Sequence, residues 1–473
     1  MTPPNLVLVF PDQMRGQAMG FVGQEPVRTP NLDRFAAQGL VLPHAVANYP
    51  VCSPCRAMMM SGLYAHSNRV IENCTSNSAP YGVELPADAA CWSDVLRAHG
   101  YSLGYIGKWH LDAPHEPYID CSNNRGAVKW NEWCPPHRRH GFDYWYAYGT
   151  YDRHTRPMYW RTGAAREEFR YVDQWGPEHE ADRAVAYLRN EGHAYRDPDK
   201  PFALVVAMNP PHMPYDLVPE RYVEAYRDLD TEALCRRPNI PPAGTRWGDY
   251  YRAHIRHYYA MISGVDEQFG RIVDALHAQG LDENTIVVFT SDHGNCLGIH
   301  DRISKNNPYE ESMRVPLIVR WPGQIAPRQD DLLWSAPDLA PTLLELMGLG
   351  DAIPPATEGR SYARLFTGQR MARPRSQLYL WTSCAQPALG RRGVRTHQYT
   401  YVVTRAPARP PEFVLYDNVN DPYQLQNIFD SQPVLARQLA TDLRHELRQW
   451  LQATGDPWLD GVQWSGREQD GDE

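Results

Sequence analysis

The chain has 473 residues, 42% of them hydrophobic and 22% charged, as is usual for a globular protein. Its formal net charge of -9 disfavours nucleic-acid binding, which needs a basic face, and no apolar stretch of about 18 residues could cross a membrane. The opening MTPPNLVLVFPD lacks the basic and apolar regions of a secretory leader, so we expect a cytoplasmic protein.

Five short apolar runs lack the alternation of polar and apolar residues that marks a half-exposed strand, and they predict buried parallel strands. They are residues 5–10, 101–106, 202–208, 285–290 and 315–322. Between them, residues 91–100 and 261–280 have apolar residues at helical spacing and end in glycine, which favours a helix end. The alternation predicts an α/β fold in which helices cover both faces of a large, mostly parallel sheet.

Residues 121–171 are rich in aromatic residues, arginine and histidine but show little periodicity. We interpret this segment as a long insertion over one end of the sheet, where loops often shape a substrate site. Some of its side chains are expected to line that site, and the candidates are Tyr148, Asp152, His154 and Arg156.

The pattern changes after about Gly368. Residues 376–383, 399–405 and 412–417 alternate like the strands of a small antiparallel sheet, and residues 433–455 predict an amphipathic helix. One face of that helix is predicted to hold Val434, Leu435, Leu439, Leu443, Leu447 and either Trp450 or Leu451.

A chain of this length is long for a single apolar core. We therefore predict a large domain of residues 1–370 and a smaller α+β domain of residues 371–473. The acidic end of the chain, residues 466–473, is expected to fray.

Polar residues follow the predicted strands, at the sheet edge where ligands bind in open α/β folds. In chain order these residues are Asp12, Gln13, Lys108, His110, His212, Asp292, His293 and Lys305. Any one of them alone is most often a helix cap or a surface group. Because five segments bring such residues to one rim, a catalytic site is the better interpretation.

The chemistry of this set is coherent. Four residues offer mostly oxygen donors for one divalent cation, and these are Asp12, Gln13, Asp292 and His293. The two lysines, together with Arg56, suit a bound oxyanion such as sulfate or phosphate. The two remaining histidines could transfer protons near neutral pH.

The segment VCSPCRAMMMSG, residues 51–62, places Cys52 and Cys55 at the spacing of a redox or zinc pair. A zinc site would need a second such pair and a redox pair would need a small thioredoxin-like domain, and the sequence offers neither. Ser53 and Pro54 instead predict a helix that starts just after Cys52, where free N–H groups would stabilise a thiolate or an oxyanion. The other cysteines are expected to be buried or free thiols.

These residues resemble the type I sulfatases of the alkaline phosphatase superfamily, whose signature Cys-x-Pro-x-Arg is CSPCR here, from Cys52 to Arg56. The segments GKWHL, SDHG, RVPLIVRWPG and the C-terminal LYDNVNDPYQLQN are also similar to this family. The resemblance extends over nearly the whole chain.

The resemblance implies that a formylglycine-generating maturation enzyme oxidises Cys52 to formylglycine, an aldehyde that hydrates to a gem-diol. One hydroxyl then attacks the sulfur of a carbohydrate or aryl sulfate monoester and displaces the alcohol. Loss of the proton from the second hydroxyl expels sulfate, whereas a plain Ser or Cys would stay sulfated.

The resemblance also implies a role for each motif residue. One divalent metal is bound by Asp12, Gln13, Cys52 in its modified form, Asp292 and His293. Arg56 supports the diol, and Lys108 and Lys305 bind sulfate oxygens. His110 handles diol protons, while His212, alone or with Lys305, protonates the leaving oxygen.

Gln13 and His293 depart from the Asp and Asn that many sulfatases carry there. The ligands then include two carboxylates instead of three. Ca²⁺ is the family-based choice, and the nitrogen donor of His293 leaves Mn²⁺ or Zn²⁺ open.

Phosphonate monoester hydrolases share the formylglycine motif and an Asp-Gln, Asp-His pattern, so phosphonate monoester or phosphodiester hydrolysis is the alternative activity. Lys108 and His110 in GKWH favour a sulfatase. A protein that binds sulfated glycans without turnover is disfavoured, because the nucleophile, metal ligands and lysines are all present.

Overall fold

The computed structural model describes residues 3–459, and the predicted fraying of residues 466–473 lies outside them. Its centre is a ten-stranded sheet. In spatial order the strands are β11 (Arg328–Gln329), β2 (Leu40–Val41), β10 (Leu317–Arg320), β9 (Thr285–Thr290), β1 (Asn5–Pro11), β8 (Phe202–Met208), β4 (Ser102–Lys108), β5 (Tyr144–Tyr148), β6 (Met158–Arg161) and β7 (Arg170–Tyr171). The strands from β9 to β5 in this order are parallel, which confirms the predicted fold class and the first four predicted strands.

The fifth predicted strand is real but its predicted direction is wrong, because β10 runs antiparallel to β9. An apolar run reports burial and carries no information on direction. A parallel neighbour would need a crossover connection, usually with a long helix. The connection between β9 and β10 holds α8 (Glu310–Met313), a helix of only four residues, and the chain turns back at the same end of the sheet.

Residues 121–171 differ from the predicted insertion, because their strands β5, β6 and β7 extend the main sheet instead of covering its end. β5 pairs in parallel with β4, and β6 pairs antiparallel with β5. The sequence of β5, YWYAY, is aromatic at four of its five positions and lacks the alternation that marks a half-exposed strand.

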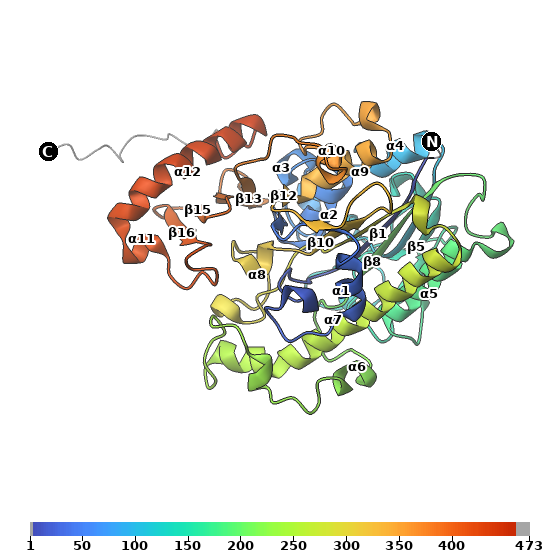
Figure 1. The fold of residues 1–473 in the computed structure, drawn as a ribbon, viewed down its shortest axis with the longest axis horizontal. Helices are drawn as coiled ribbons and strands as arrows, with labels where there is room; N and C mark the ends of the chain where they lie inside the picture. Colours follow the sequence, from blue (N-terminus) through green and yellow to red (C-terminus); the bar gives the residue numbers. More distant parts are fainter. Residues whose placement is uncertain (1–2, 460–473) are drawn as a thin grey trace.

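Helices cover both faces of the sheet (Figure 1). One face carries α1 (Pro30–Ala36), α5 (Gly176–Arg189) and α7 (Arg246–Ala278), and the other carries α2 (Cys52–Ser61), α4 (Trp92–Ala98) and α9 (Leu339–Leu346). Alternate residues of β1 supply the two cores, with Leu6 and Leu8 on the α2 side and Val7 and Val9 on the α7 side. None of the helices in the described part of the chain combines the length and apolar character of a membrane span.

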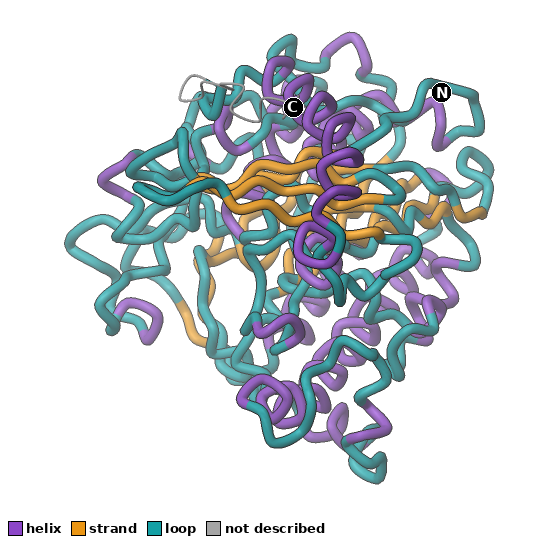
Figure 2. The backbone as a smooth tube through the Cα atoms, turned by 90° about the vertical axis from the view of Figure 1, so that its left-hand side faces the viewer, coloured by secondary structure: helices purple, strands orange, loops and turns teal. Residues whose placement is uncertain are grey.

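The second sheet is antiparallel and consists of β13 (Gln377–Thr382), β14 (Gly390–Arg395), β15 (Tyr399–Arg405) and β16 (Glu412–Asp417). Three of these strands were predicted, and β14 was missed because its sequence GRRGVR has two glycines and three arginines and no apolar alternation. β14 is nevertheless the only partner that joins β13 to β15 in this sheet. Figure 2 shows α12 (Pro433–Ala453) crossing these strands.

The buried face of α12 differs at its start from the predicted one. Val434 and Leu435 are 66% and 40% exposed, and the buried positions are Ala436, Ala440, Leu443, Leu447 and Leu451. These five positions form one stripe at helical spacing. Two of the buried positions are alanines, which are only weakly apolar, and the larger Val434 and Leu435 were therefore predicted in their place.

One apolar cluster connects the two sheets. Leu378 and Val394 of the small sheet and Leu447 of α12 belong to the same buried cluster as Met58 of α2 and Leu343 of α9. The division of the chain near residue 370 into two domains stays a prediction.

Gly107 offers a test of how tightly β4 is fitted beside β8. Its φ is +97°, and a Cβ there would lie 2.2 Å from the carbonyl oxygen of Ala207. Gly107→Ala should therefore lower the free energy of unfolding in urea by at least about 3 kcal/mol, since backbone strain and a backbone clash act together.

The matched control is Gly100→Ala, where φ is +84° but nothing lies within 4 Å of the added Cβ. This variant should lose only about 1–2 kcal/mol, the cost of a left-handed alanine. Equal losses in the two variants would contradict the clash at Gly107.

Candidate active site

Cys52 is the first residue of α2, and Val51 is the N-cap. The helix thus begins one residue earlier than predicted, and Ser53 does not cap it. Instead the Ser53 hydroxyl donates to the carbonyl of His110 at 2.7 Å and accepts from the backbone N–H of Cys74 at 3.0 Å. Cys52 is 2% exposed and lies in the positive partial field of the helix N-terminus.

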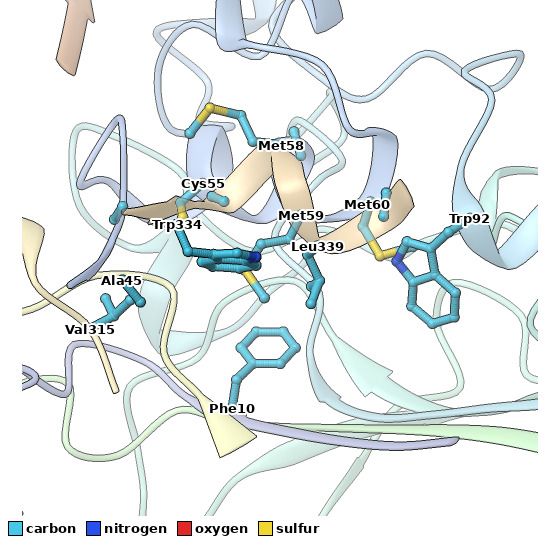
Figure 3. Close-up of a cluster of buried hydrophobic side chains, with 14 of the residues drawn as sticks. Phe10, Ala45, Cys55, Met58, Met59, Met60, Trp92, Val315, Trp334 and Leu339 are labelled. Atoms are coloured by element: carbon cyan, nitrogen blue, oxygen red, sulfur yellow. The ribbon is translucent and has the colours of Figure 1, made fainter. Parts of the chain in front are cut away.

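Cys55 has different surroundings from Cys52. It lies among buried apolar side chains that include Met59 and Trp334 (Figure 3). Burial raises the pKa of the Cys55 thiol well above its usual value. The two cysteines therefore do not form a functional pair, and Cys55 packs in the core.

Four predicted site residues form a compact donor cluster. The ligand atoms of Asp12, Cys52, Asp292 and His293 all lie within 4.8 Å of one another, and all four residues are buried. His293 donates from Nδ1 to the carbonyl of Gly294 at 2.9 Å, so Nε2 is the ring nitrogen that faces the cluster. That Nε2 lies 3.4 Å from Asp12 Oδ1 and 3.4 Å from Cys52 Sγ.

Gln13 completes this cluster from a left-handed backbone conformation with φ of 69°. Its Nε2 donates to the hydroxyl of Tyr215 at 3.2 Å, so Oε1 is the atom that faces the site and accepts from Lys305 Nζ at 3.1 Å. Two buried carboxylates, one imidazole nitrogen and one amide oxygen are a donor set that fits a divalent cation.

Arg56 binds the carboxylates of both Asp12 and Asp292. Its Nε donates to Asp292 Oδ2 at 2.9 Å, and its Nη2 donates to Asp12 Oδ2 at 3.2 Å. Burial and the neighbouring Asp12 nevertheless raise the pKa of Asp292. The negative charge of Asp292 is thus not fully compensated at its buried position, which is the condition that a bound cation relieves.

Two ammonium groups flank Cys52. Lys305 Nζ lies 3.1 Å and Lys108 Nζ 3.8 Å from Cys52 Sγ, and Lys108 also donates to Asp12 Oδ2 at 2.7 Å. Burial and Asp12 raise the pKa of Cys52, but Lys108, Lys305 and His293 outweigh them and hold it well below its usual value. The position of the sulfur is therefore a strongly anion-stabilising one.

The loop that carries Lys305 is anchored by β14, the strand that was not predicted. Arg391 of β14 donates from Nη1 to the carbonyl of Asn306 at 2.7 Å, and the N–H of Asn306 donates to the carbonyl of Pro50 at 3.1 Å. The same loop is thus fixed on one side by the small sheet and on the other by the segment that leads into Cys52.

The two remaining histidines lie in opposite electrostatic surroundings. Burial lowers the pKa of His110 to about 4, and neither of its ring nitrogens has a hydrogen-bond partner among the described residues. Burial and the two lysines lower the pKa of His212, but Asp12 and Asp152 outweigh them and raise it to about 9. One imidazole is therefore neutral at pH 7 and the other is charged.

The structure thus brings all ten predicted site residues to one edge of the sheet. Of the four candidates in residues 121–171, Asp152 and His154 contact His212. Tyr148 instead donates to Glu180 in the core, and Arg156 pairs with Asp173 at the surface.

Two further residues of the site were missed. Asn209, which accepts from Lys108 Nζ at 3.1 Å, follows β8 directly and carried the same signal as the residues that were found. Tyr215 orients Gln13 and Asn295 through its hydroxyl, and no sequence pattern marks it.

Comparison with known proteins agrees with this geometry. A family model described as Sulfatase matches residues 4–349, and one described as N-sulphoglucosamine sulphohydrolase, C-terminal, matches residues 298–453. An endo-4-O-sulfatase of Bacteroides thetaiotaomicron is 39% identical, with 96% of this chain and 93% of that protein covered. A ulvan-active sulfatase of Formosa agariphila is 33% identical, with 90% and 77% covered.

Among solved structures, the YidJ protein of Bacteroides fragilis is 50% identical and superimposes with a TM-score of 0.93, covering 97% of each chain. Membership of the family implies a divalent metal and a formylglycine made from the motif cysteine, and a cluster of Cys, Asp and His side chains is present for them. This chain belongs to the sulfatase family and is a sulfuric ester hydrolase.

Proposed function

We propose that the chain hydrolyses the sulfate monoester of a saccharide to the alcohol and inorganic sulfate, at a formylglycine made from Cys52. The observation that carries this proposal is the pair of lysines, with Lys305 Nζ at 3.1 Å and Lys108 Nζ at 3.8 Å from Cys52 Sγ. Two ammonium groups around one buried nucleophile position suit an oxyanion that reacts there. A maturation enzyme that oxidises Cys52 is the protein partner that this function requires.

The metal is assigned to the side chains that converge on Cys52. They are Asp12, Gln13, Asp292, His293 and the modified residue at position 52. The mainly oxygen donor set supports Ca²⁺, and the nitrogen of His293 keeps Mn²⁺ or Zn²⁺ as alternatives. When bound, the ion supplies a positive charge that polarises the nucleophilic hydroxyl and a sulfate oxygen.

The side chains around it have complementary tasks. Arg56, which contacts both carboxylates, keeps them in place next to the nucleophile. Lys108 and Lys305 bind sulfate oxygens. Neutral His110 accepts a proton from the nucleophile side, and charged His212 donates one to the leaving oxygen. Two histidines with pKa values pushed apart are the arrangement that separates a base from an acid.

The similarity to an endo-4-O-sulfatase, at 39% identity over 96% of the chain, supports a carbohydrate chain with a 4-O-sulfate as the first substrate to test. Aryl sulfates are the smaller alternative. A phosphonate monoester or a phosphodiester is the second candidate, because Gln13 and His293 leave the site with two carboxylates instead of three.

The deciding experiment measures kcat/KM on sulfated oligosaccharides that differ in sulfate position, on an aryl sulfate, and on the phosphonate ester with the same leaving group. The protein is first produced with the maturation enzyme, and the aldehyde is verified. We expect the saccharide sulfates to be turned over best. A higher kcat/KM for the phosphonate than for the matched sulfate would overturn the proposal.

The two cysteines of the motif should respond differently to substitution. Cys52→Ala should reduce kcat by about 10⁴-fold or more, as loss of a nucleophile does in hydrolases, while Cys55→Ala keeps most of the turnover. Mass spectrometry of the peptide that carries Cys52 should find the aldehyde in wild type and in Cys55→Ala. Active protein with an unmodified cysteine at position 52 would refute this mechanism.

Metal binding should depend on the buried carboxylates. Asp292→Asn should lower the bound Ca²⁺ measured by elemental analysis, and it should abolish the rise in melting temperature that Ca²⁺ gives chelator-treated wild type. For wild type that rise corresponds to about 3 kcal/mol at a hundredfold excess over Kd. The control is Asp351→Asn, a change at an exposed carboxylate, which should keep both properties. Full Ca²⁺ stabilisation of Asp292→Asn would contradict the assigned ligands.

A further inference from the structure

Asp152 is a carboxylate at the edge of the site that no metal or sulfate role uses. It follows β5, and its Oδ1 lies 3.4 Å from Nδ1 of His212. The same Nδ1 donates to the carbonyl of Met213 at 2.8 Å. Nδ1 therefore carries a proton and is occupied on its protein side, which leaves Nε2 as the ring nitrogen available to a substrate.

Two amides hold the Asp152 carboxylate in place. Asn123 donates from Nδ2 to Oδ2 at 2.9 Å, and Asn209 donates from Nδ2 to Oδ1 at 3.1 Å. Burial opposes the charged form of the carboxylate, but His212 and then Lys108 and His154 outweigh it and hold the pKa of Asp152 well below its usual value. The carboxylate is thus a fixed negative charge with a fixed direction.

Asn209 links this carboxylate to the sulfate side of the site. While its Nδ2 contacts Asp152, its Oδ1 accepts from Lys108 Nζ at 3.1 Å. A continuous path of contacts therefore runs from His212 through Asp152 and Asn209 to Lys108. The amide of Asn209 therefore holds the carboxylate that contacts His212 in a fixed position relative to the Lys108 ammonium group.

Asp152 is one of two carboxylates that favour the charged form of His212. Burial, Lys305 and Lys108 all disfavour the imidazolium, and Asp12 and Asp152 favour it. Asp12 already accepts from Lys108 and Arg56 and belongs to the metal donor cluster. Asp152 is the carboxylate that is left to compensate the charge on His212.

We propose that Asp152 is a positioning residue for the acid of the reaction: it orients the His212 ring with Nε2 toward the leaving oxygen and keeps the ring protonated. This inference rests on the role of His212 under the proposed function. In the step it assists, a hydroxyl oxygen of the modified residue at position 52 forms a bond to sulfur, while the S–O bond to the alcohol breaks and its electron pair stays on the alcohol oxygen. Nε2–H of His212 transfers its proton to that oxygen, and neutral His212 then regains a proton from water.

A leaving-group comparison tests the proposal. Asp152→Asn should lower kcat/KM on a saccharide sulfate, whose alkoxide needs a proton, on the order of 10²-fold. It should change kcat/KM on 4-nitrophenyl sulfate much less, since nitrophenolate leaves without protonation. Equal losses on both substrates would overturn the proposal, because they would mean that Asp152 acts through Lys108 or through the fold. No loss on either substrate would overturn it as well.

The pH profile gives a second readout on the saccharide sulfate alone. Activity needs protonated His212 and is lost as the pH rises through its pKa. Removal of the negative charge at Asp152 lowers that pKa, so the alkaline limb of kcat/KM should move by about one unit or more to lower pH in Asp152→Asn. Asp152→Glu should restore part of the alkaline limb. An unmoved limb would contradict the proposed electrostatic role.

The controls separate this proposal from the one on which it rests. Asp173→Asn changes a carboxylate of the same region that pairs with Arg156 at the surface, and it should leave both substrates unaffected. His212→Ala should show the same substrate dependence as Asp152→Asn, only larger. If His212→Ala lost both substrates equally, His212 would not be the acid and the role of Asp152 would fall with it. Wild type that hydrolysed no sulfate ester would refute the proposed function itself.

Discussion

The contact between Arg56 and two buried carboxylates is the interaction on which the site depends. Asp12 comes from the end of β1 and Asp292 from the end of β9, and both are fully buried next to one another. Two such charges in the interior are costly unless cations compensate them. Arg56 contacts both from α2, which also carries Cys52, so the position of the nucleophile and the compensation of the charges depend on the same helix.

The remaining groups are arranged around that contact according to charge. Lys108 and Lys305 lie next to Cys52 and make its position suitable for an anion. The two histidines differ because their neighbours differ: His110 is buried without a charged hydrogen-bond partner, whereas His212 faces the carboxylate of Asp152. One sheet edge thus holds a nucleophile position, an anion site, a neutral imidazole and a charged one.

The site was easier to predict from the sequence than the fold around it, for a physical reason. Residues at the ends of buried parallel strands must meet at one edge, so Asp12, Lys108 and Asp292 could be grouped without knowing the strand order. Strand direction and pairing depend on contacts far apart in sequence, and the apolar run that became β10 does not carry that information. The start of α2 was misplaced for a similar reason, since the Ser53 hydroxyl that looked like a cap contacts His110 and Cys74 instead. β14 has almost no apolar residues and is recognisable only through its two partner strands.

The hydrogen bond from Arg391 of β14 to the carbonyl of Asn306 changes how the C-terminal part of the chain is to be understood. A shortened chain that ended before residue 390 would retain Asp12, Cys52 and Asp292, together with the strands that carry them. It would lose the guanidinium that fixes the loop of Lys305, the lysine nearest to Cys52. The small sheet is therefore a structural part of the anion site, and a search for the smallest active fragment of this chain has to begin by keeping it.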